Sequence, residues 1–125
     1  MALQKTNLAE KFAAFEEFWS PRLIGEVNGQ HVKLAKLQGE FCWHHHDNED
    51  ELFLVVSGTL RMKIREAGAE RELRLAPGEM VIIPKGTEHL PIADEECQVL
   101  LFEPAGTLNT GNIHNERTVQ PIRAF

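Results

Sequence analysis

Residues 42–52 read CWHHHDNEDEL, so three consecutive histidines stand directly before a run of acidic residues. In an extended strand, side chains two positions apart point to the same face. His44 and His46 therefore share one face of an expected strand, and His45 points to the opposite face. Two imidazoles placed in this way can bind one metal ion at about 2.0–2.2 Å.

A carboxylate is available close to these histidines. Glu51 follows the acidic turn and opens the apolar run at residues 52–57 (LFLVVS), which is typical of a buried strand. Antiparallel pairing of that strand with the histidine segment would bring Glu51 alongside the two same-face imidazoles. Mixed imidazole and carboxylate ligands suit iron, manganese, nickel, cobalt and zinc, and the pattern does not choose between these metals. The alternative interpretation is a solvated turn of histidines and acids.

A second segment, residues 77–89, reads PGEMVIIPKGTEH. Turn residues at Pro77-Gly78 and Pro84-Lys85-Gly86 enclose a short apolar strand, and His89 follows the second turn. A lone histidine is more often a surface residue or a hydrogen-bonded residue than a metal ligand. The start of a strand after a rigid turn is, however, a position that can aim the His89 side chain into a barrel.

The rest of the sequence is organised in short strands separated by turns. Asn28-Gly29 is a strong two-residue hairpin signal. Apolar and basic residues alternate strictly over residues 60–65, which is the pattern of a strand with one buried face. Many short strands of this kind predict an all-β antiparallel sandwich or small barrel. The expected strands span residues 22–28, 31–38, 52–57, 60–65, 70–75, 80–83 and 97–102.

A helix is expected before the first strand. Its apolar stripe at helical spacing consists of Leu8, Phe12, Phe15 and Trp19. Asn7 is the expected N-cap, with Glu10 as its capping-box partner, and Ser20-Pro21 ends the helix. This helix is expected to lie on the outside of the barrel.

Length, composition and charge limit the possible functions. The 125 residues make a single domain, with the helix over residues 1–20 and a barrel with a C-terminal loop and tail over residues 21–125. The formal net charge of -6 argues against a nucleic-acid partner. No apolar run is long enough to cross a membrane and no signal peptide is recognised, so a cytoplasmic protein is expected.

Several catalytic chemistries are disfavoured by the residues present. The chain has no tyrosine, and Ser57 lies outside the glycine-flanked turn that hydrolases use. Cys42 and Cys97 form no CxxC pair, which disfavours a cysteine-based zinc site. Cys42 has the same strand parity as His44, so it is expected to point into the barrel as core filler, or as an oxidisable thiol or extra ligand. Lys36 is expected either to hold an anionic substrate in the cavity or to be solvated.

The two histidine segments together resemble the cupin superfamily. The motifs stand here as Gly39, His44-x-His46, Glu51 and Gly58, and as Gly78, Pro84-x-Gly86 and His89. The resemblance covers residues 39–93 and is close to that of small single-domain bacterial cupins. Two positions depart from the family pattern. Gly39 and His44 are separated by four residues, whereas the family usually has five. Ala93 stands where the family has Asn. Neither of these departures affects a metal ligand.

The resemblance implies a fold, a cofactor and a class of activity. The fold is a double-stranded β-helix, or jelly-roll barrel, and the cofactor is one divalent transition-metal ion. The implied ligands are His44, His46, Glu51 and His89. The implied activity is that of an oxygenase, isomerase or decarboxylase on a small polar or anionic metabolite, with no further catalytic residue assigned. The alternatives are a non-catalytic module that binds a metal or a metabolite, and an empty structural barrel, which the complete ligand set disfavours.

A small molecule and a second copy of the chain are the expected partners. The helix and the apolar carboxy-terminal end (Val119, Ile122 and Phe125) add more apolar surface than one small barrel readily covers. Open sheet edges also favour a neighbouring subunit. We therefore expect a two-fold homodimer through strands near the amino-terminal hairpin or through the tail. Folding of the tail over its own barrel is the alternative.

Overall fold

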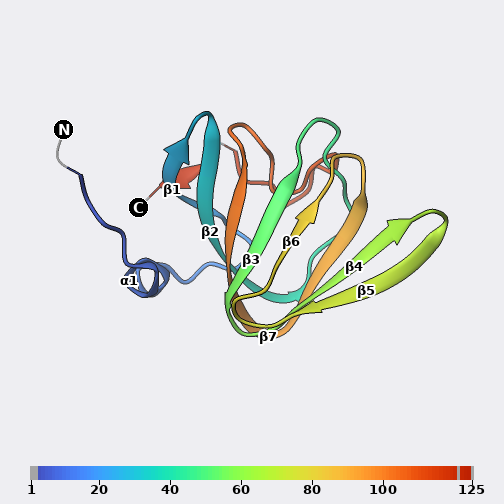
Figure 1. Ribbon diagram of the computed structural model, residues 1–125, viewed down its shortest axis with the longest axis horizontal. Coiled ribbons are helices and arrows are strands. Elements are labelled where there is room, and N and C mark those ends of the chain that lie inside the picture. Colours follow the sequence, from blue (N-terminus) through green and yellow to red (C-terminus); the bar gives the residue numbers. More distant parts are fainter. Residues whose placement is uncertain (1–2, 121, 125) are drawn as a thin grey trace.

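The computed structural model describes residues 3–120 and 122–124, whose strands form a jelly-roll β-sandwich with one short helix outside it (Figure 1). The prediction of an all-β jelly roll with an amino-terminal helix is confirmed. The elements are α1 (Leu8–Ala13), β1 (Arg22–Val27), β2 (Gln30–Glu40), β3 (Glu51–Ser57), β4 (Leu60–Glu66), β5 (Ala69–Leu75), β6 (Met80–Ile83), β7 (Glu88–Pro104) and β8 (Arg123–Ala124). Among these residues, no helix has the length and apolar character needed to cross a membrane.

The long strand β7 joins the two layers of the sandwich. Its first part pairs with β4 and its last part pairs with β3, while β2 runs antiparallel to it along most of its length. The β2–β7 register shifts between Leu37 and Gly39, where φ of Gly39 is +83°. A bulge of this kind bends a strand and increases its twist. The same two strands can therefore belong to both layers.

Alternating side chains fill the space between the layers. Leu60, Met62 and Ile64 of β4 are buried, as the alternation over residues 60–65 predicts. The hairpin at Asn28-Gly29 also forms as predicted, with β1 and β2 as its antiparallel arms. Both predictions are confirmed. They could be made from the sequence because strand alternation and hairpin turns depend on neighbouring residues.

The helix is shorter than predicted. It begins after the expected cap, where the backbone N–H of Glu10 donates to Asn7 Oδ1 at 3.0 Å, but it ends at Ala13. The expected apolar stripe is divided between two clusters, because Phe12 and Phe15 pack on Leu34 outside the barrel whereas Trp19 packs in the main core. The packing of Trp19 in the main core therefore stabilises the chain more than further turns of the helix would.

Strand β7 begins at Glu88 and is much longer than the predicted strand at residues 97–102. Pro91 and the acidic residues 94–96 hide its beginning in the sequence, because proline and acids are depleted in strands. The histidine segment, in contrast, is less regular than predicted. It contains only an isolated bridge between His44 and His89, instead of the regular strand that the sequence predicts.

The tail adds a short strand to the edge of the sheet. Arg123–Ala124 (β8) pairs in parallel with β1, so this part of the tail lies on its own barrel. Residues 105–120 form no strand and cross one end of the sandwich, as the abundance of turn residues predicts. Phe125, which belongs to the expected apolar end, lies outside the described residues.

Candidate metal centre

Four predicted ligand residues come together inside the barrel. His44, His46, Glu51 and His89 each offer one ligand atom, and these atoms lie within 4.8 Å of one another. All four side chains are buried, with exposed fractions between 0% and 4%. The structure therefore brings the two histidine-bearing segments to a single point, as the resemblance implied.

The two segments are held together by backbone hydrogen bonds. The N–H of His44 donates to the carbonyl of His89 at 3.1 Å, and the N–H of His89 donates to the carbonyl of His44 at 2.9 Å. Strand β3, which begins with Glu51, pairs with β6 and β7. The prediction that it pairs directly with the histidine segment is wrong, because His89 at the start of β7 takes that place beside His44.

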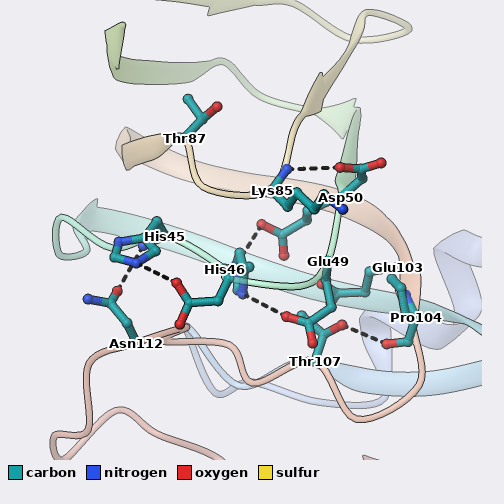
Figure 2. A network of polar contacts seen from close by, with 12 residues as sticks. His45, His46, Glu49, Asp50, Lys85, Thr87, Glu103, Pro104, Thr107 and Asn112 are labelled. Atoms are coloured by element: carbon teal, nitrogen blue, oxygen red, sulfur yellow. Dashed lines mark hydrogen bonds and ion pairs between the residues drawn. The ribbon is translucent and has the colours of Figure 1, made fainter. Parts of the chain in front are cut away.

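The acidic turn between the histidines and β3 also has a structural role. Asp50 Oδ1 accepts the backbone N–H of Lys85 at 2.8 Å (Figure 2). The carbonyl of His46 accepts the N–H of Gly86 at 2.7 Å. Both contacts fix the turn that precedes His89. Asp50 is therefore more than the solvated residue that the sequence suggested.

Backbone carbonyls determine the orientation of two of the imidazoles. His44 Nδ1 lies 2.9 Å from the carbonyl of Cys42, and His89 Nδ1 lies 2.9 Å from the carbonyl of Thr87. A carbonyl can only accept a hydrogen bond, so each Nδ1 carries the proton. The Nε2 lone pairs of both rings are then free to bind a metal ion.

Several buried polar atoms at the centre have no hydrogen-bond partner. They are Nδ1 and Nε2 of His46, Nε2 of His89 and Oε1 of Glu51. Glu51 Oε1 lies 3.3 Å from His46 Nε2 and 3.4 Å from His89 Nε2. Buried polar atoms are rarely left unsatisfied, and ligands at about 2.1 Å from one ion stand about 3 Å from their neighbours. The residues present therefore fit a transition-metal ion.

The protonation of the cluster also suits a metal ion. Burial, together with the nearby His89, lowers the pKa of His44 to about 4. Burial alone would raise the pKa of Glu51, but the adjacent imidazoles of His46 and His89 hold that pKa well below its usual range. Burial would lower the pKa of His46, but the Glu51 carboxylate outweighs it and raises that pKa. The centre thus provides an ionised carboxylate and a neutral His44.

A buried ion pair lies behind the ligands. Lys33 Nζ contacts Glu103 Oε1 at 3.1 Å and donates to the carbonyl of Thr107 at 3.2 Å. Burial and the negative charge of Glu51 raise the pKa of Glu103 well above its usual value. Sequence reasoning missed both residues. The signal was present, because Glu103 continues the inward parity of Cys97, Val99 and Leu101 in β7.

An apolar pocket adjoins the centre on the side of His44 and Glu51. Its other walls include Trp19, Leu37, Phe41, Phe53, Val99 and Leu101. No lysine or arginine lines it, among the residues that the structure describes. The pocket is therefore a place where the body of a small molecule could lie beside an ion held by the cluster.

Other residues singled out in the sequence lie away from the cluster. Lys36 is buried and donates to the carbonyl of Phe15 at 2.6 Å, so neither of its expected roles is found. Cys42 is half-buried beside Asn115 and belongs to neither the core nor the cluster. Its free thiol is therefore not the core filler that the sequence predicts.

The remaining histidines lie outside the cluster. His45 Nε2 lies 2.9 Å from Asp47 Oδ1, and His114 is exposed. His31 is buried next to Glu26, with His31 Nε2 and Glu26 Oε1 3.1 Å apart. His31 is therefore not a solvent-exposed residue, although it follows the hairpin turn at Asn28-Gly29.

Comparisons with known proteins agree with this geometry. A family model described as "Cupin domain" matches residues 30–103. The solved structure of a cupin-2 domain containing protein from Shewanella frigidimarina superposes with a TM-score of 0.74 at 45% identity, covering 79% of this chain and 93% of that chain.

Two curated relatives match over shorter segments. The uncharacterized protein YdbB of Bacillus subtilis (strain 168) is 41% identical over 66 residues, which cover 53% of this chain and 56% of that protein. A 3-hydroxyanthranilate 3,4-dioxygenase 2 of Aspergillus clavatus is 32% identical over 87 residues, which cover 66% of this chain and 45% of that protein. The chain thus spans about half the length of the curated relatives it matches.

The stability of the metal-free chain is expected to depend on pH through His44. Its folded pKa of about 4 lies below the ordinary 6.5, so the unfolded chain binds the proton more readily between these values. The free energy of unfolding should therefore decrease as the pH falls from about 6.5 to about 4, by up to roughly 3 kcal/mol from this residue. Urea unfolding in the presence of a chelator measures this decrease.

The matched control is His44→Gln, which has no titrating group at this position. Its free energy of unfolding should decline less steeply than that of the wild type over the same pH range. An equal decline in both proteins would show that His44 does not have the lowered pKa.

Proposed function

The chain belongs to the cupin family, and from this premise we propose that it is a metal-dependent enzyme of the dioxygenase type acting on a small molecule. The proposed ligands of one divalent transition-metal ion are His44, His46, Glu51 and His89. The observation that carries the proposal is the convergence of unpartnered, buried ligand atoms beside an apolar pocket.

Each proposed ligand has a defined task. Such an ion, when bound, supplies a Lewis acid, and a redox-active metal adds the capacity to activate dioxygen. The carbonyls of Cys42 and Thr87 orient the rings of His44 and His89. Glu51 offsets part of the positive charge. Four protein ligands leave about two positions of a six-coordinate ion for a substrate with two donor atoms.

The oxygenase type is favoured over the isomerase and decarboxylase types. The relative from Aspergillus clavatus is named as a dioxygenase, and its 32% identity extends over 66% of this chain. The pocket also offers no cationic partner for the expected anionic metabolite, because its described walls carry no lysine or arginine. We therefore infer that donor atoms on the ion, rather than a cationic side chain, hold the polar part of the substrate.

A non-catalytic binding module is the second candidate. One observation favours it: beyond His44 and Glu51, the residues that line the pocket include no acid or base suited to proton transfer. Such a module would bind a metal ion or a chelating metabolite without turnover.

We also propose a cytoplasmic homodimer. Met80 and Ile82 of the edge strand β6 are 52% and 53% exposed, which gives an apolar edge that a second copy could cover. This edge is a better candidate than the predicted hairpin or tail. Light scattering at micromolar concentration should give a mass near twice 14.2 kDa, and a mass near that of one chain would contradict the dimer.

Removal of a proposed ligand should remove the metal ion. His44→Ala and His89→Ala are each expected to lose most of the metal, because three ligands hold an ion more weakly than four. His45→Ala is the matched control and should keep about one ion per chain, since its ring contacts Asp47 outside the cluster. Elemental analysis after mild purification measures the metal content. Equal retention in all three variants would refute the ligand assignment.

The catalytic proposal is tested by oxygen consumption. The chain loaded with ferrous iron is expected to take up one dioxygen per molecule of a catechol or aminophenol substrate, because a dioxygenase transfers both oxygen atoms to its product. An oxygen electrode and product analysis measure this ratio, and Glu51→Ala serves as the control that should lack activity. Substrate binding without oxygen uptake for each metal tried would favour the binding module.

A further inference from the structure

Two aromatic side chains form one wall of the pocket beside the metal centre. The rings of Trp19 and Phe41 are stacked, with centroids 4.6 Å apart and planes inclined by 18°. The Phe41 ring also meets the His44 ring edge-on, with centroids 5.5 Å apart. The wall therefore continues directly to one of the proposed ligands.

Trp19 is held in a conformation that is uncommon for a residue with a side chain. Its φ is +60°, in the left-handed region, which costs roughly 1–2 kcal/mol for a non-glycine residue. Its backbone N–H donates to the carbonyl of Lys36 at 2.8 Å, and its indole Nε1 donates to the carbonyl of Gln38 at 2.8 Å. These bonds fix the indole at the pocket. Strain kept in this way is typical of functional positions.

The C-terminal loop packs against this wall. The Arg117 guanidinium lies 5.7 Å from the Trp19 ring centroid and 5.6 Å from the Phe41 ring centroid, and its Nη1 donates to the carbonyl of Glu40 at 2.7 Å. Asn109 Nδ2 donates to the carbonyl of Arg117 at 2.6 Å. The free space in the pocket is about 30 Å³, which is less than an aromatic ring fills, so the walls must move apart for a ring to bind.

The chemistry of the walls distinguishes between kinds of substrate body. Apart from His44 and Glu51, the described lining offers one polar side chain, Asn109. A carboxylate inside the pocket would lose its hydration, which is costly, because no cationic side chain lines the described walls and the Arg117 guanidinium outside the lining already donates to the carbonyl of Glu40. A flat aromatic ring would gain a stacking interaction of about 0.5–1.5 kcal/mol in addition to the burial of its area.

We propose that Trp19 and Phe41 are specificity-determining residues, and that they select substrates whose body is a neutral planar aromatic ring. The donor atoms of such a substrate would face His44 and Glu51. The inference rests on the proposed function for the position of the ion. It adds the substrate class, which the metal cluster by itself does not determine.

The test uses three chelators with the same two oxygen donors. Benzohydroxamate carries a planar ring, cyclohexanecarbohydroxamate carries a saturated ring of similar size, and acetohydroxamate carries no ring. Binding is measured by calorimetry on the full chain loaded with zinc, which is redox-silent. We expect benzohydroxamate to bind at least about tenfold more tightly than the cyclohexane compound. Equal affinity for the two ring compounds would overturn the inference.

Variants show whether the aromatic wall selects the substrate or only supports the fold. Trp19→Leu should reduce the preference for benzohydroxamate to less than about threefold and leave the affinity for acetohydroxamate unchanged. Phe41→Leu makes the same test should the first variant not fold. Trp43→Leu is the matched control, because the Trp43 ring lies under Arg65, 3.8 Å from its guanidinium, and does not line the pocket. An equal loss for all three chelators in Trp19→Leu would contradict the specificity role.

Fluorescence gives a second measurement and separates this inference from the proposed function. Trp43→Phe leaves Trp19 as the sole tryptophan of the chain, and benzohydroxamate should quench its emission while acetohydroxamate should not. A chain that takes up no zinc contradicts the proposed function. The fluorescence titrations are repeated on the metal-free chain, so that binding of the ring to the wall is also tested without an ion. Absence of ring-dependent quenching with and without zinc contradicts the inference alone.

Discussion

The backbone pair between His44 and His89 determines the arrangement of the rest of the centre. Two hydrogen bonds, of 3.1 and 2.9 Å, join segments that are 45 positions apart in the sequence. Within the described residues, the histidine segment contains no other ladder pairing. Further hydrogen bonds hold it, from Gly86 to the carbonyl of His46 and between Asn112 and the backbone of His45. Without these bonds, the three imidazoles would have no common point at which to meet Glu51.

This arrangement carries an energetic cost that a metal ion would offset. The cluster buries an ionised carboxylate and leaves three imidazole nitrogens without hydrogen-bond partners. The Lys33 and Glu103 side chains, both buried, lie in contact behind the cluster. Buried charges are tolerated when they are paired or coordinate metals. The fold of this small barrel is therefore adapted to hold positive charge at its centre.

The parts of the fold that depend on neighbouring residues could be predicted from the sequence. The alternation in β4, the Asn28-Gly29 hairpin and the Asn7 cap are local features, and all three are confirmed. The set of four clustered residues was implied by the resemblance to cupins, and the structure brings the same four together. Their convergence was correctly expected, although the predicted pairing of β3 with the histidine segment was wrong.

The parts that depend on distant contacts could not be predicted. The helix ends early because Trp19 packs into the barrel, and the turn at Asp50 is ordered by Lys85, which is 35 positions away. The Lys33–Glu103 pair needs the register between β2 and β7, which no local pattern supplies. The aromatic wall also escaped prediction, because Trp19 and Phe41 come from segments that the sequence placed in different elements.

The most direct test of this account is the crystal structure of the metal-loaded chain, with anomalous diffraction recorded at the absorption edge of the metal. The account predicts one strong anomalous peak within about 2.0–2.3 Å of the Nε2 atoms of His44, His46 and His89 and of a Glu51 carboxylate oxygen. A peak at the exposed acidic turn around Asp47, or no peak inside the barrel of a protein shown to contain metal, would contradict it.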